Sequence, residues 1–140
     1  MIIPLAPRLL LDTNIVTYIS SETDWKKTYE PIVFGKKLFI CFMTQAELLE
    51  GAYRKKMSSK NIQKYLNVLW SRYITLPSND LICDHFARIR FQRRNRPISV
   101  PDALIAATAL AYELPLVTHN AKDLAGIDGL QLVTCYEEGE

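Results

Sequence analysis

Four acidic residues stand where their side chains could act together on a phosphate group. Asp12 directly follows three leucines, and Glu47 lies early in an expected helix. Asp102 opens an alanine-rich segment, and Asp123 comes just after a short apolar run. Carboxylates that are brought together repel one another and are costly to ionise without a cation. Oxygen ligands favour Mg²⁺ or Mn²⁺ over zinc, and such a cation polarises a phosphoryl oxygen and activates water. The four acids therefore predict metal-dependent cleavage of a phosphodiester bond.

Each acid also has a purely structural interpretation. The runs "TQAE" (44–47) and "SVPD" (99–102) both fit a capping box, in which the acid binds a backbone N–H at the start of a helix. Asp12 could accept hydrogen bonds from the turn that follows it, and Asp123 could be an ordinary surface acid. A carboxylate directly after "LLL" is, however, poorly tolerated without partners or a metal. Taken one at a time, the acids leave both interpretations open.

Other catalytic chemistries lack support in the sequence. There is no glycine-rich phosphate-binding or dinucleotide-binding loop and no GxSxG motif. The three cysteines are widely spaced and form no CxxC, which disfavours disulfides and structural zinc and favours a reducing cytoplasm. His119, one of two histidines, could line the site, although a loop histidine is more often structural.

Positive charge is concentrated in the middle of the chain. Residues 54–96 contain eleven Lys and Arg against two acids, whereas the rest of the chain contains six basic and thirteen acidic residues. A basic segment beside a carboxylate cluster suits a nucleic acid substrate, although two solvated helix faces would look the same. The residues predicted to contact phosphates share one expected helix or directly follow it: Arg88, Arg90, Arg93, Arg94 and Arg96.

Short apolar runs alternate with helical patterns along the chain. The expected strands cover residues 8–12, 37–42, 73–76, 115–118 and 130–134, and the expected helices cover 14–20, 44–56, 59–73, 79–94 and 101–114. This alternation predicts an α/β fold with a central parallel sheet flanked by helices, as a single domain over residues 1–140. No run approaches the roughly 20 apolar residues of a membrane span. Because ligands bind beyond the carboxyl ends of parallel strands, the four acids are expected to meet there.

Four segments resemble a known family in order and spacing. "LLLDTNIV", "TQAELLEG", "PDALIAATAL" and "LVTHNAKDL" are similar to the four motifs of PIN-domain ribonucleases, and most of all to the VapC toxins of bacterial and archaeal toxin–antitoxin pairs. The resemblance spans residues 9–133 or so. It implies a PIN-like three-layer sandwich, Mg²⁺- or Mn²⁺-dependent cleavage of RNA, and inhibition by a cognate antitoxin protein.

The resemblance also implies roles for individual residues. The metal-ligand aspartates of the family correspond to Asp12 and Asp102, and its second-motif acid corresponds to Glu47. Thr13 and Asn14 match the polar residues after the first aspartate. Where many relatives have their fourth aspartate, this chain has His119 and Asn120, with the acid delayed to Asp123. Asp123 is assigned as the fourth catalytic acid, with Asn120 as the alternative at this position; Thr118 and Asn120 are otherwise assigned supporting roles.

Partners are expected in addition to RNA. The resemblance implies a homodimer, and four aromatic residues are interpreted as its adhesive surface: Trp25, Tyr29, Tyr65 and Trp70. Tyr65 and Trp70 could instead fill the core of their own helix pair. An antitoxin helix is expected to dock near Asp12 on Ile15, Val16 and Ile19, with an arginine placed among the carboxylates. Two alternatives remain: a catalytically silent PIN-like module that binds RNA or protein, and a housekeeping PIN nuclease of RNA processing.

Overall fold

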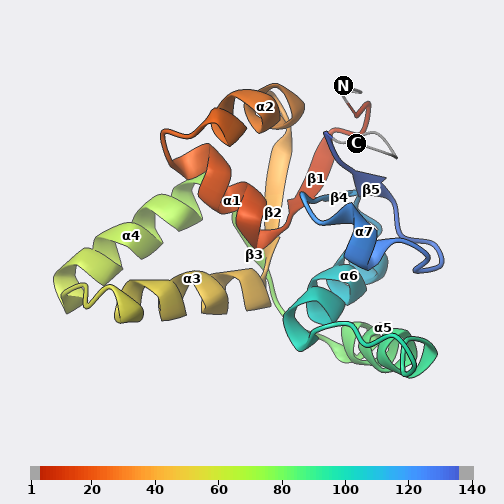
Figure 1. The fold of residues 1–140 in the computed structure, drawn as a ribbon. Helices are drawn as coiled ribbons and strands as arrows, with labels where there is room; N and C mark the ends of the chain where they lie inside the picture. The colour runs from red at the N-terminus through yellow and green to blue at the C-terminus, as the bar shows by residue number, and fades with distance from the viewer. Residues whose placement is uncertain (1–3, 136–140) are drawn as a thin grey trace.

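The computed structural model describes residues 4–135, so the ends of the expected domain, residues 1–3 and 136–140, lie outside the described residues. Five parallel strands form one sheet in the order β3-β2-β1-β4-β5 (Figure 1). Their bounds are β1 (Arg8–Leu11), β2 (Lys37–Cys41), β3 (Ile74–Leu76), β4 (Leu116–Val117) and β5 (Leu132–Val133). The predicted parallel α/β fold is confirmed.

Helices connect the strands and cover both faces of the sheet (Figure 1). Their bounds are α1 (Thr13–Ser20), α2 (Asp24–Val33), α3 (Phe42–Arg54), α4 (Ser59–Arg72), α5 (Asp80–Gln92), α6 (Val100–Tyr112) and α7 (Ala121–Leu124). No helix in the described part of the chain is long and apolar enough to cross a membrane.

The alternation of side chains along each strand produces two apolar layers. Leu10, Phe39 and Leu116 face the layer of α5 and α6. Leu9, Leu11, Ile40 and Val117 face the opposite layer, which contains buried residues of α1, α2 and α4. Since successive strand residues point to opposite faces, a run such as "LLL" is buried on both sides. Asp12 directly follows this run, at the carboxyl end of β1, and is itself buried.

Helix α6 is buried along nearly its whole length. Ala103, Ala106 and Ala107 are fully inaccessible, and their small side chains let the helix lie close to the sheet and to α5. Helix α6 begins at Val100, with Ser99 as its N-cap, and ends with Glu113 in the left-handed conformation (φ 55°). This rigid placement sets Asp102 at the start of α6 on the carboxyl side of the sheet.

Two helices were not expected from the sequence. Helix α2 contains Pro31, which marks a helix end in sequence patterns because it cannot donate a backbone hydrogen bond. Burial of Tyr29, Ile32 and Val33 holds this helix in place despite the proline. Helix α7 has only four residues, too few for a recognisable period.

Three residues predicted to lie on the surface are buried. Tyr29, proposed for the homodimer contact, is fully inaccessible, as are Ile15 and, to within 1%, Val16, proposed for antitoxin docking. These predictions were wrong because α1 and α2 pack against the sheet with these side chains inward. Trp25 and Tyr65 are half-buried, and Trp70 remains exposed. The homodimer itself stays a prediction.

Candidate functional site

Asp12 is the central polar residue at the carboxyl edge of the sheet. Its side chain caps α1, with Oδ1 accepting the backbone N–H of Thr13 at 2.7 Å. Oδ2 accepts the hydroxyl of Thr118, which follows β4, at 2.8 Å. Asp12 is only 6% exposed and Thr118 is fully buried. The start of α1 and the residue after β4 thus fix the orientation of one buried carboxylate, and the expected hydrogen bond from the following turn is present.

A second hydrogen-bonded group connects α1 to α3. The Thr13 hydroxyl oxygen lies 2.8 Å from Glu47 Oε1, the acceptor, and 3.0 Å from the Thr44 hydroxyl oxygen. Thr44 is fully buried. Thr13 therefore meets two residues that follow it by 31 and 34 positions in the sequence, and these contacts hold Glu47 in place beside Asp12.

The capping box predicted at residues 44–47 is absent. Helix α3 begins at Phe42, and its N-cap is Cys41, whose Sγ accepts the backbone N–H of Met43. Glu47 therefore lies in the second turn, too far along the helix to bind its first N–H group. Thr44, interpreted from the sequence as a helix cap, instead contacts Thr13 at the site. Its functional position was not predicted; the only sequence feature that could have indicated it is its place about one helical turn before Glu47.

Asp102 combines both interpretations that the sequence left open. Its backbone N–H donates to the Ser99 hydroxyl at 3.2 Å, which is one half of the predicted capping box. Its half-buried carboxylate also acts electrostatically on Asp12. A structural role of the backbone and a functional role of the side chain are compatible at this position.

The pKa of the Asp12 carboxyl is raised above its ordinary value of 3.8. Burial is the largest cause, since it disfavours the charged form. The negative charges of Asp102 and Glu47 raise this pKa further, while the hydrogen bonds from Thr118 and Thr13 oppose the change. Three acids, one directly after β1, one in α3 and one in α6, therefore share one electrostatic environment.

Asp123 is connected to this group through a loop. Its exposed carboxylate accepts the Asn120 side-chain amide at 2.7 Å, and the backbone N–H of Asn120 donates to the Thr118 hydroxyl at 3.0 Å. The link from Asp123 to Asp12 therefore runs through Asn120 and Thr118. Asn14, the other predicted supporting residue, is exposed at the start of α1.

His119 packs within an aromatic cluster. Its Nδ1 lies 2.7 Å from the hydroxyl of Tyr29, and its ring makes an edge contact with Trp25 at a centroid distance of 4.2 Å. Burial lowers the pKa of His119. The histidine thus anchors the segment after β4 to α2, which is the structural role that the sequence left open.

The donor atoms suit a hard divalent cation. The three neighbouring acids offer only carboxylate oxygens, and a cation would relieve the repulsion that raises the pKa of Asp12. Within residues 4–135, however, no three His, Cys, Asp or Glu side chains are grouped closely enough to hold a metal ion. The site is electrostatically suited to a cation without being a closed cage.

The five predicted phosphate-binding arginines lie on α5 and in the loop that follows it. Arg88 pairs with Asp84 at 2.9 Å, while Arg90 Nη1 donates to the Ile98 carbonyl at 2.6 Å. Arg93 donates to the carbonyls of Arg96 and Asp123, at 3.2 and 3.0 Å. Arg94 stacks over the Phe91 ring and donates to the Phe91 carbonyl, and Arg96 is exposed. Several of these guanidinium groups therefore bind the protein's own backbone.

Comparison with known proteins gives a consistent result. The family model described as "PIN domain" matches residues 9–130. "Ribonuclease VapC1" of Haemophilus influenzae (strain R2866) is 30% identical over 126 residues, which cover 87% of this chain and 93% of that protein. The "tRNA(fMet)-specific endonuclease VapC" of Shigella flexneri is 26% identical over 126 residues, covering 89% and 95%.

Two solved complexes contain chains of similar fold. VapBC-1 from nontypeable Haemophilus influenzae includes a chain that is 29% identical, with a TM-score of 0.78 and coverage of 93% of this chain and 99% of that one. VapBC2 from Rickettsia felis, bound to a promoter DNA fragment, gives 25% identity, a TM-score of 0.75 and the same coverage. The similarity in both cases spans nearly the whole length.

Proposed function

Because this chain belongs to the PIN domain family, we propose that it is a metal-dependent endoribonuclease and the toxin of a toxin–antitoxin pair. The family match covers most of the chain, and the relatives carry the names ribonuclease and endonuclease. The observation that carries the proposal is the buried Asp12 carboxylate. Both of its oxygens are hydrogen-bonded, and the charges of Asp102 and Glu47 act on it.

Burying an ionised carboxylate beside two other acids lowers the stability of the fold. Its burial and the two nearby negative charges disfavour its ionised form, and only two hydrogen bonds offset this. An arrangement of this kind is understandable as a binding site for a cation, with Asp12 and Asp102 as ligands. A bound Mg²⁺ or Mn²⁺ would polarise the scissile phosphate and activate water.

The chain's own residues orient the reacting groups. Thr118 and the backbone of Thr13 direct the two oxygens of Asp12, and the Thr13 hydroxyl holds Glu47 Oε1. This leaves the second oxygen of Glu47 to accept a proton from an attacking water molecule. Asp123 is assigned to the same catalytic group through Asn120, and Asn14 lies exposed at the mouth of the site.

The substrate and the partner follow from charge and from the relatives. Arg94 and Arg96 are exposed in the loop that leads into α6, and Arg88 is exposed on α5, where they can reach phosphates of a bound RNA. An antitoxin is proposed because chains of the same fold occur in VapBC complexes. The guanidinium group of a partner arginine can bind among the carboxylates of Asp12, Glu47 and Asp102 in place of a metal cation. Co-expression with the adjacent reading frame is expected to give a complex that does not cleave RNA.

The central experiment is incubation with total RNA and Mg²⁺ or Mn²⁺. We expect cleavage that EDTA stops and that Asp12→Asn abolishes, because an amide cannot supply the ligand charge. The matched control is Asp128→Asn, which makes the same chemical change at an exposed loop position and is expected to retain activity. An intact RNA with wild-type protein and both metals would refute the nuclease and favour a silent RNA- or protein-binding module. Harmless expression of an active nuclease without a neighbouring partner would favour a housekeeping enzyme.

A further inference from the structure

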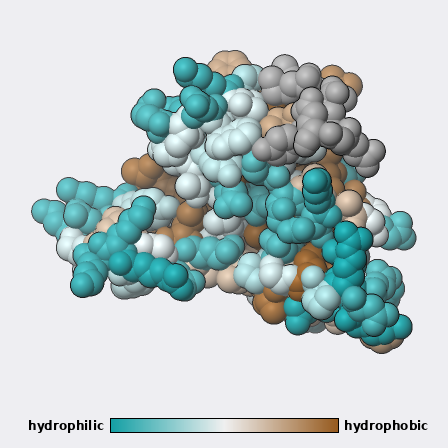
Figure 2. Space-filling view, viewed as in Figure 1, coloured by the Kyte–Doolittle hydropathy of each residue, from teal (hydrophilic) through white to brown (hydrophobic). Residues whose placement is uncertain are grey.

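The α3–α4 arm, defined as α3, α4 and the connecting residues 55–58, projects from the carboxyl side of the sheet (Figure 1). Figure 2 shows hydrophilic side chains gathered over its outer end, at the left of the view. The basic residues of this tip are all exposed: Arg54, Lys55, Lys56, Lys60 and Lys64. The sequence contains no acid from residue 51 to residue 72. The arm therefore ends in an unbalanced patch of positive charge.

Intramolecular pairing accounts for only one of these five charges. Arg54 pairs with Glu50 at 2.6 Å, one helical turn away, and both side chains are largely exposed. In the described residues, none of the four lysines forms an ion pair. Apart from Glu50, which pairs with Arg54, no acid lies near the lysines in the sequence, so their charges are available to a ligand.

Helix stability does not explain the lysines either. Lys60 lies in the first turn of α4, where the helix dipole is positive and no acid is present. Lys60 and Lys64 are one turn apart, so that two like charges face one another on the exposed side of α4. Both arrangements disfavour the helix, which indicates that the charges serve an interaction outside the chain.

An exposed aromatic ring accompanies the charges. Tyr53 is 66% exposed in the last turn of α3, directly before Arg54. An exposed ring beside several cations is typical of single-stranded nucleic acid binding, in which bases stack on the ring and phosphates contact the cations. An apolar protein partner would be served by the ring but not by five exposed charges.

Helix α3 joins this patch to the acids. Glu47 and Arg54 lie seven residues apart on the same helix, which corresponds to about 10 Å at 1.5 Å per residue. An RNA strand positioned for cleavage at Asp12 and Glu47 can therefore continue along α3 and bring its next phosphates to the arm tip. The patch is close enough to the acids to grip the same strand.

We propose that the tip of the α3–α4 arm is the docking surface for the single-stranded RNA that flanks the cut, with lysines on its phosphates and Tyr53 under a base. The inference rests on the proposed ribonuclease function. It assigns the main electrostatic contribution to RNA binding to the arm. The arginines of α5 and the following loop are largely engaged by Asp84, Phe91 and backbone carbonyls.

The test compares two double variants with the same change in net charge. Lys60→Glu/Lys64→Glu changes the arm tip, and Lys27→Glu/Lys37→Glu changes exposed lysines at the start of α2 and of β2.

The probe is a labelled single-stranded RNA of mixed sequence and about 20 nucleotides, longer than the site sizes of single-strand-binding proteins. Binding is measured in EDTA at several salt concentrations, so that the RNA stays intact. We expect about tenfold weaker binding for the arm variant and a salt slope that is smaller by about 1.4, or 0.7 per lost phosphate contact. The control is expected to bind within about twofold of wild type.

A Tyr53 pair separates stacking from charge. Tyr53→Ala is expected to weaken binding without changing the salt slope, while Tyr53→Phe retains binding because the ring persists. With Mg²⁺ present, the arm variant is expected to raise KM and leave kcat unchanged, since it removes grip and no reacting group. Circular dichroism and Tm establish that each variant is folded. If Lys60→Glu/Lys64→Glu does not fold, Lys60→Gln/Lys64→Gln takes its place.

The outcomes distinguish this inference from the proposed function. Equal RNA affinity and salt slope in the arm and control variants overturn the docking surface. So does an arm variant that binds RNA normally but loses its complex with the partner protein, because the patch would then bind protein. If wild-type protein binds the probe through the arm but never cuts RNA, the nuclease proposal fails while the docking surface stands.

Discussion

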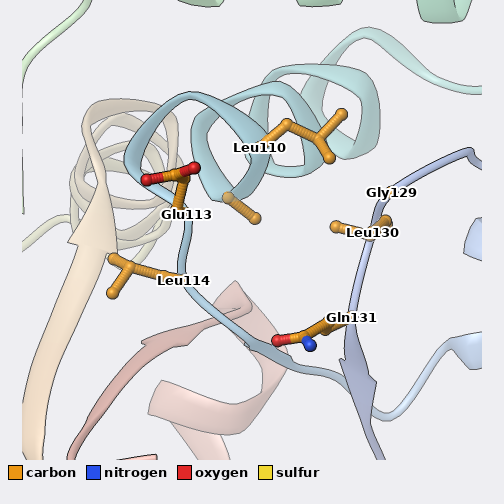
Figure 3. Close-up of a pocket in the computed structure, with 7 residues that line it drawn as sticks. Leu110, Glu113, Leu114, Gly129, Leu130 and Gln131 are labelled. Carbon is orange, nitrogen blue, oxygen red and sulfur yellow. The ribbon is translucent and has the colours of Figure 1, made fainter.

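The two edges of the sheet differ in what they bury. At the carboxyl edge lie Asp12, Thr44 and Thr118, three of the four buried polar or charged residues in the described part of the chain. The opposite edge has a pocket of about 310 Å³ between the end of α6 and residues 129–131. Leucine side chains line it, and its polar residues, Glu113 and Gln131, are exposed (Figure 3).

This difference separates what the fold needs from what the site needs. A buried carboxylate is costly, and apolar packing alone would close either edge of the sheet. Among the described residues, the one buried acid lies where other acids and hydroxyl groups from four elements meet. Changes at the carboxyl edge should therefore alter activity more than stability, and changes at the opposite edge should do the reverse.

The largest effect is expected for Asp102→Asn. It should lower the RNA cleavage rate by more than the roughly 10–100-fold that loss of an outer-shell partner costs, because it removes the charge of a proposed direct ligand. The melting temperature should change little, since the Ser99 cap uses the backbone N–H. Glu113→Gln, the equivalent change at the opposite edge, should retain activity. Full activity with a lowered melting temperature for Asp102→Asn would assign Asp102 to helix capping alone.

The converse change is Leu114→Ala at the opposite edge. Leu114 is buried beside the pocket, so its truncation should lower the free energy of unfolding by about 2–3 kcal/mol. Urea unfolding measures this loss, and kcat under conditions where the variant is folded should match wild type. A large loss of kcat in fully folded Leu114→Ala would show that the two edges are coupled.

A smaller effect is expected for Thr118→Val. The variant keeps the shape of the side chain but loses the hydrogen bonds to Asp12 Oδ2 and from the Asn120 N–H, so activity should fall by about tenfold. Thr108→Val is the matched control, because Thr108 is also fully buried but bonds to Leu104 and Cys41 within the core. Steady-state cleavage assays compare the two variants. Equal losses of activity would mean that the Thr118 hydroxyl has no special part in orienting Asp12.

The smallest effect concerns pH. The raised pKa of Asp12 means that the folded metal-free protein holds this proton more tightly than the unfolded chain does. The contribution to stability is therefore fully present below about pH 3.8 and is lost as pH rises through the raised pKa. Urea unfolding in EDTA across this range should show a more negative dependence of stability on pH for wild type than for Asp12→Asn. Parallel curves would show that Asp12 is ionised as readily in the folded protein as in the unfolded one.

The sequence by itself determined the sheet and the acids. Apolar runs such as "LLL", alternating with helical periods, can be buried only between two helical layers, which fixes a parallel α/β architecture. Because the carboxyl ends of parallel strands share one edge, the meeting of Asp12, Glu47 and Asp102 follows from their places after β1, in α3 and in α6. Both conclusions depend on local pattern and on a general rule of topology.

Only the tertiary structure decided the features that depend on contacts between distant residues. Helix α2 forms despite Pro31 because Tyr29 and Ile32 are buried against the sheet. Thr44 supports the site because α3 begins at Phe42, which brings its hydroxyl to Thr13 of another helix. Arg93, in the loop after α5, donates to the backbone carbonyl of Asp123, which lies 30 residues further along the chain. No local pattern encodes these partners, since their free energies come from groups that only the folded chain brings together.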